Sequence, residues 1–255
     1  AANFAADVTF ADGADIITAS AGTSNFRAGV NAGNSIESGG NYNTVVGDEA
    51  GTALTTGDKN TAIGYSSLAA TTTGTDNTAL GRNALAANST GDRNTASGNA
   101  ALGSNTTADS NTATGYGALF TNTTGASNTA VGDSALTANT TGAGNTVVGK
   151  DAAIANTTAA NNTIVGFEAF GTNTTGHSNV AIGKATMYGN TTGDLNTAAG
   201  YAALSENTTA DGNTAFGAYA LQVNSTGANN VAVGAYALDA NTTASYNTAL
   251  GYASL

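Results

Sequence analysis

Apolar side chains recur along this chain at a fixed interval of 17 residues, with Asn, Thr, Gly and Ala filling most positions between them. The unit runs without insertion from Asn43 to Tyr246 as twelve copies, and a thirteenth copy spans Asn247 to Leu255. A typical copy, residues 128–144, reads Asn-Thr-Ala-Val-Gly-Asp-Ser-Ala-Leu-Thr-Ala-Asn-Thr-Thr-Gly-Ala-Gly. Because equivalent copies take equivalent places on a regular winding, this period predicts a solenoid rather than a globule.

Positions within each copy are numbered from its first Asn, which never varies. Position 2 is Thr except at Val180 and Val231, position 3 is small, position 4 is usually apolar and position 9 is usually Leu. The alternation over positions 2 to 4 has a period of two, which predicts a short strand with positions 2 and 4 on one face. We expect positions 4 and 9 to form the core and position 3 to point away from it.

Gly occupies position 5 in every copy, where it predicts a turn with positive φ or a close approach of two backbones. These glycines are Gly47, Gly64, Gly81, Gly98, Gly115, Gly132, Gly149, Gly166, Gly183, Gly200, Gly217, Gly234 and Gly251. Positions 7 to 10 predict a second short strand around the Leu, and the Asn-Thr-Thr-Gly region after it predicts turns. The expected fold is all-β, a parallel β-solenoid (β-roll) of 17-residue coils. At about 4.8 Å per coil, the stack is roughly 60 Å long.

Three segments follow from this pattern. Residues 43–255 are the solenoid of twelve complete repeats and a partial thirteenth, and residues 25–42 form a degenerate first coil that is one residue longer. Residues 1–24 differ from the repeat, and the Asp-Gly between residues 7–10 and 15–18 indicates a hairpin. This segment is interpreted as an N-terminal cap or joint.

Each coil holds only two or three large apolar side chains, a small gain against the cost of ordering a whole coil. A second apolar contact is therefore expected, and the small residues at position 3 would allow neighbouring chains to approach closely. We predict self-association of the chain as a homotrimer.

Composition narrows the possible functions. The formal net charge of −11 disfavours nucleic acid and anionic membranes as partners. Because no stretch approaches the roughly 20 apolar residues of a membrane span, no membrane insertion is expected. The chain has no Cys, and its single His, His177, lies in a predicted turn. No catalytic constellation is recognisable, so neither enzymatic activity nor a cofactor or metal is expected.

Asn at position 12 with Thr two residues later makes an N-glycosylation sequon in ten successive copies. The Asn residues are Asn88, Asn105, Asn122, Asn139, Asn156, Asn173, Asn190, Asn207, Asn224 and Asn241. One interpretation is a column of glycans that coats the rod. The other, which crowding of glycans at every coil favours, is an internal ladder of stacked amides.

Two further columns carry polar or aromatic groups. Position 16 holds Asp58, Asp92, Asp109, Asp194 and Asp211, and position 6 holds Tyr65, Tyr116, Tyr201 and Tyr252. Acids in successive coils could share a cation, although a Gly-Asp turn with solvated carboxylates explains them more simply. The tyrosines could stack on sugars, or could simply cover the surface of the strand.

The recurring Asn-Thr-Ala-Val-Gly, with Ala-Leu and Asn-Thr-Thr-Gly between its copies, resembles the repeat regions of phage tail-fibre-like proteins. It is also similar to the head repeats of YadA-type trimeric adhesins, whose repeat is shorter. The resemblance covers residues 25–255 and implies a homotrimeric parallel β-roll. It further implies an extracellular location on a virion fibre or cell-surface appendage, with a host-surface glycan or receptor as partner.

The sequence therefore favours a structural, adhesive fibre shaft. The alternative is the subunit of an extracellular filament that assembles end to end by strand complementation, with or without glycans on its sequons. A further alternative is an ice-binding solenoid, which requires two outward Thr ranks with one residue between them. Adjacent Thr residues at positions 13 and 14, such as Thr123 and Thr124, disfavour it because neighbours on a strand point in opposite directions.

Overall fold

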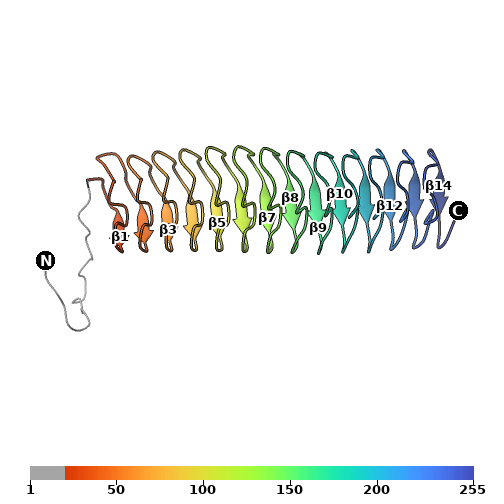
Figure 1. The fold of residues 1–255 in the computed structure, drawn as a ribbon, viewed down its shortest axis with the longest axis horizontal. Helices are drawn as coiled ribbons and strands as arrows, with labels where there is room; N and C mark the ends of the chain where they lie inside the picture. The colour runs from red at the N-terminus through yellow and green to blue at the C-terminus, as the bar shows by residue number, and fades with distance from the viewer. Residues whose placement is uncertain (1–20) are drawn as a thin grey trace, which may run out of the picture.

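A computed structural model describes residues 21–255 and shows a straight parallel β-solenoid (Figure 1). Its strands form one parallel sheet of fourteen, in which spatial order follows chain order. Each strand has three residues: β1 Phe26–Ala28, β2 Thr44–Val46, β3 Thr61–Ile63, β4 Thr78–Leu80, β5 Thr95–Ser97, β6 Thr112–Thr114, β7 Thr129–Val131, β8 Thr146–Val148, β9 Thr163–Val165, β10 Val180–Ile182, β11 Thr197–Ala199, β12 Thr214–Phe216, β13 Val231–Val233 and β14 Thr248–Leu250. The predicted all-β parallel solenoid is thus confirmed, and no helix occurs among these residues.

The register repeats from coil to coil. Thr129 of β7 pairs with Thr146 of β8, and Phe26 of β1 pairs with Thr44 of β2 across the longer first coil. Residues 25–42 therefore form a coil that stacks on the others despite their extra residue. The hairpin expected around residues 7–10 and 15–18 lies outside the described residues.

The direction of the strand faces was predicted wrongly. Positions 2 and 4 do share a face, but it is the outer one, and Ile63 at position 4 is 41% exposed. Position 3 points inward, where Ala79, Ala130 and their equivalents are completely buried against the Leu of position 9. The physical reason is width: in most coils the buried Leu of position 9 fills the short interior, and the residue opposite it is Ala.

Exceptions to this pattern show that the interior is filled by volume. In the first complete repeat, Val45 replaces the usual Ala at position 3 and Gly51 replaces the usual Leu at position 9. Leu54 at position 12 of the same coil supplies the missing apolar side chain. Val147 shares its coil with the small Ala153, whereas the next coil buries both Ile164 and Phe170. Because interiors are close-packed, a gain at one position is balanced by a loss nearby.

The second strand predicted at positions 7 to 10 is not formed. Residues at positions 7 and 9 take left-handed backbone conformations, as at Ser134 (φ 57°) and Leu136 (φ 54°). Their amides still bond to neighbouring coils, since Ser134 N–H donates to Tyr116 O (2.8 Å) and Leu136 N–H donates to Ala152 O (3.0 Å). Left-handed residues at alternate positions turn the chain within a short distance. The hydrogen bonds between coils are kept, so the coils stack here without a second strand.

Candidate functional site

The Gly at position 5 ends every strand in a conformation that other residues rarely adopt. The φ values of this column lie between 122° (Gly251) and 148° (Gly166). A Cβ on Gly132 would stand 2.4 Å from the carbonyl oxygen of Gly149 in the next coil. Positive φ and close backbone approach therefore both require Gly here, and the column sets how closely the coils can stack.

The Asn at position 1 fastens the start of each strand. The Oδ1 atom of Asn128 accepts the backbone N–H of Asn145 in the next coil (3.0 Å). Its Nδ2 donates to the carbonyl of Gly142 at the end of its own coil (2.8 Å). One buried side chain thus closes its coil and joins it to the next.

The Asn residues at position 12 form a second ladder inside the rod. Nδ2 of Asn139 donates to Oδ1 of Asn122 (2.8 Å) and to the carbonyl of Gly142 (2.9 Å), so both ladders meet on this carbonyl. The ten Asn residues of this column lie inside except at its last coil, and the first nine are at most 1% exposed. The nitrogen that a glycan would occupy is therefore buried and already bonded, a geometry that favours the ladder interpretation of the sequons.

Thr residues at position 13 also bond along the stack. Oγ1 of Thr123 donates to the carbonyl of Thr140 (3.0 Å), and Thr140 repeats the contact with Thr157 (3.1 Å). Their neighbours at position 14, such as Thr124, are exposed. Positions 13 and 14 therefore do not present two parallel ranks of free hydroxyls.

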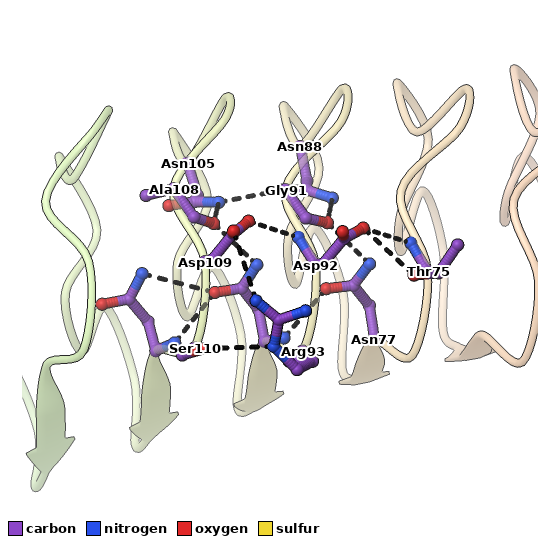
Figure 2. A network of polar contacts seen from close by, with 12 residues as sticks. Thr75, Asn77, Asn88, Gly91, Asp92, Arg93, Asn105, Ala108, Asp109 and Ser110 are labelled. Carbon is purple, nitrogen blue, oxygen red and sulfur yellow. Dashed lines mark hydrogen bonds and ion pairs between the residues drawn. The ribbon is translucent and has the colours of Figure 1, made fainter.

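The Asp side chains at position 16 accept hydrogen bonds from backbone N–H groups (Figure 2). Oδ1 of Asp92 accepts the N–H of Thr75 in the preceding coil (2.7 Å), and Oδ1 of Asp109 accepts the N–H of Asp92 (2.8 Å). The other oxygen of Asp109 lies 3.4 Å from the guanidinium of Arg93. Within residues 21–255 no group of three or more His, Cys, Asp or Glu could hold a metal ion. The column is thus a set of caps for the amides of adjacent coils.

Exposed aromatic side chains gather at the corner that follows the Gly of position 5. Tyr65 and Tyr116 stand apart, but Tyr201 and Tyr252 belong to a strip completed by Tyr219 and Tyr236 at position 7. Adjacent ring centroids in the strip are 5.1, 5.0 and 5.9 Å apart. Tyr219 and Tyr236 stand in a different column from Tyr201 and Tyr252, so the tyrosines of position 6 alone did not predict the strip. Desolvation, helped by a hydrogen bond with Tyr201, raises the pKa of Tyr219 above its ordinary value.

The single histidine of the chain, His177, makes a structural contact. His177 lies at the surface with its Nε2 atom 3.1 Å from a carboxylate oxygen of Asp194. The same carboxylate accepts the backbone N–H of His177 (2.7 Å), so it has a structural role. No nucleophile takes part in this contact.

The most extensive exposed feature is the outer face of the sheet, made by positions 2 and 4 of β2 to β14 and called here the sheet face. Thr lines one rank, and the other rank is mainly aliphatic: Val148, Val165 and Ile182 are 37%, 38% and 45% exposed. The sheet face carries no charged residue, whereas Asp, Glu, Lys and Arg gather on both of its borders, at positions 6, 7, 16 and 17. An uncharged strip between charged borders has the layout of a protein interface.

No helix among residues 21–255 is long and apolar enough to cross a membrane. Comparison with known proteins adds no assignment, since no family model, no curated protein and no solved structure matches the chain.

Proposed function

We propose that this chain is the shaft of an extracellular adhesive fibre, in which three copies pack along their length through the sheet face. The observation that carries the proposal is this uncharged face, with one Thr rank and one mainly aliphatic rank, on a protein whose net charge is −11. Apolar surface that runs the length of a rod gains most when an identical rod covers it. Three chains around one axis would bury all three sheet faces at once.

The inward direction of position 3 changes how the trimer is built. Position 3 was expected to make the contact between chains, but its Ala side chains are buried within each coil. The Thr and aliphatic ranks of positions 2 and 4 take that role instead. In the proposed trimer the aliphatic rank, from Val46 to Leu250, would pack around the axis and the Thr hydroxyls would bond across it.

A straight stack of coils suits a shaft because each coil contacts only its neighbours, so length can change without a change in cross-section. Figure 1 shows this linear arrangement from β1 to β14. In the proposed fibre the rod holds a binding surface away from a virion or cell, and a host-surface glycan or receptor is its partner.

The proposal is tested by the mass of the purified protein in light scattering, measured over a dilution series. We expect a particle of three chains whose mass does not depend on concentration. The double variant Val148→Lys/Ile182→Lys places a ring of cations on the proposed axis and should release monomers, because burying unpaired charge is strongly unfavourable. The control Thr141→Lys alters an exposed residue at position 14 and should leave the mass unchanged.

A monomeric wild-type protein, or a double variant that keeps the wild-type mass, would contradict the trimer. Filaments that lengthen without limit in negative-stain images would instead favour end-to-end assembly. Circular dichroism of both variants shows whether the solenoid itself remains folded.

The sheet face offers one competing function. Its Thr rank presents one hydroxyl and one methyl group in each coil except those of Val180 and Val231. Position 4 lies two residues further on, which is the spacing that an ice-binding face requires. The second rank varies from Ala199 to Phe216, however, and contains a single Thr, Thr114. Because such a rank is not flat, we favour contact between chains over ice binding as the role of the sheet face. A measurement that finds no thermal hysteresis would exclude ice binding.

A further inference from the structure

A hollow of about 190 Å³ lies on the surface of the central coils, away from the sheet face. It is lined by Ala100, Tyr116, Gly117, Phe120, Ser134 and Thr137. These residues occupy positions 6, 7 and 10 of three successive coils. The hollow is therefore a local departure from the repeat and not a groove that every coil shares.

Missing side chains create the space. Position 7 carries Asn83, Ser134 and Asp151 in other coils, but here it is Gly117, and a Cβ built on Gly117 meets no atom within 4 Å. The preceding coil has only the methyl group of Ala100 at this position. Tyr116 and Phe120, which are 63% and 41% exposed, remain as aromatic walls.

The Phe120 wall is held in place by a second Gly. A Cβ on Gly103, in the preceding coil, would stand 2.8 Å from the Phe120 ring, so the ring lies directly over this Gly. A ring supported from below keeps its orientation when no ligand is bound. The hollow is thus largely formed in advance, as small-molecule sites usually are.

We propose that this hollow binds one pyranose ring of a neutral glycan. Aromatic walls suit the apolar C–H faces of a sugar, and the hydroxyls of Tyr116, Ser134 and Thr137 can bond to its hydroxyls. A volume of about 190 Å³, below that of sites for drug-sized ligands, limits the ligand to a single ring.

Charge selects against acidic sugars. No lining residue is charged, and the carboxylate of Asp133, the residue before Ser134, accepts a hydrogen bond from Ser134 Oγ (2.9 Å). A carboxylate at the rim, on a chain of net charge −11, repels sialic and uronic acids.

This inference rests on the proposed adhesive function and names its class of ligand, but the site belongs to one chain. Its residues lie outside positions 2 and 4, so trimer formation through the sheet face does not use them. Failure of the trimer and failure of glycan binding can therefore be observed separately on the same preparation.

The test is saturation-transfer NMR of the full chain with the methyl glycosides of glucose, galactose, mannose and N-acetylglucosamine, and with sialic acid for comparison. We expect transfer to the ring protons of at least one neutral glycoside, with a Kd on the order of 1 mM. Gly117→Asn should weaken this binding at least about ten-fold because its side chain fills the hollow. Asn is tolerated at this position, as Asn83 with φ 57° shows.

The matched control is Ala185→Asn, which makes an equivalent change at position 7 of another coil, with φ 53°, and should keep wild-type binding. A second pair compares Tyr116→Ala, which should lose binding, with Tyr65→Ala, which should not. No transfer to any neutral glycoside, stronger transfer to sialic acid, or unchanged binding by Gly117→Asn would each overturn the proposal. Light scattering of every variant reports the oligomer independently.

Discussion

Gly132→Ala is expected to destabilise the solenoid by about 4 kcal/mol or more, at the upper end of single-residue effects. Gly132 has φ 139°, which is costly for a residue with a side chain, and the new methyl carbon would stand 2.4 Å from the carbonyl oxygen of Gly149. Neither backbone can withdraw, because the N–H of Gly132 bonds to Thr114 O and the N–H of Gly149 bonds to Val131 O, both at 2.8 Å. Thermal unfolding followed by circular dichroism measures the loss.

The control for this prediction is Gly117→Ala, another Gly with positive φ. Its added methyl group meets open space, and Ala occupies the same position at Ala100 with φ 58°. We expect a cost of about 1–2 kcal/mol. Equal melting temperatures for the two variants would show that backbone contact between coils is not what restricts position 5.

The location of Gly132 adds a qualitative expectation. In a linear stack, stability is a sum over coils and their interfaces, and a disrupted interface divides the rod into two blocks. Gly132→Ala should therefore broaden the melting curve or split it into two steps. Hydrogen exchange should increase first in β7 and β8, the strands on either side of the altered contact.

The period alone was sufficient to predict the solenoid, the strand at positions 2 to 4 and the turn at position 5. Each of these predictions rested on a geometrical requirement that recurs in every coil. The left-handed residues at position 9 could not be predicted in the same way. Leu136 and its equivalents disfavour positive φ, and only the closure of the coil, which depends on its neighbours, places them there.

The direction of the strand faces shows a second limit. Apolar residues at position 4 and Ala at position 3 suggested that the larger side chain was buried, as in a globular domain. A coil this narrow reverses the assignment, because Leu136 already fills the space opposite Ala130. The aliphatic rank is therefore exposed in the single chain, and the same residues that suggested a core now suggest an interface.

Features that break the repeat were the hardest to find. The hollow exists because Gly117 lacks a side chain that position 7 usually carries, and the Tyr strip exists because Tyr219 and Tyr236 stand in a different column from Tyr201. Alignment of the copies emphasises what they share. Candidate binding surfaces on a repetitive rod are found where one or two coils differ from the rest, and their recognition requires the coordinates.

Asn128→Ala is the second substitution for which we expect a large effect, a loss of about 3–5 kcal/mol. Removing the amide leaves the backbone N–H of Asn145 without its acceptor and takes from Gly142 O one of its two amide donors. It also removes the contact with Asn111 Oδ1, at 3.2 Å. A buried polar group left unsatisfied costs about 1–3 kcal/mol, and the lost hydrogen bonds to Gly142 O and Asn111 Oδ1 add to this cost. Urea denaturation monitored by circular dichroism gives the free energy of unfolding.

Asn99→Ala is the matched control, since Asn99 is exposed at position 6, and it should change stability by less than about 0.5 kcal/mol.

Asn128→Asp separates the two functions of the amide. It keeps the oxygen that accepts the Asn145 N–H but replaces the donor to Gly142 O with a charged oxygen, so it should be at least as damaging as Asn128→Ala near neutral pH. Protonation of the carboxyl group restores a donor, and the Asp variant should therefore regain part of its stability in acid while Asn128→Ala does not. Equal stability of Asn128→Ala and Asn99→Ala would mean that the position 1 ladder follows from coil stacking and does not stabilise it.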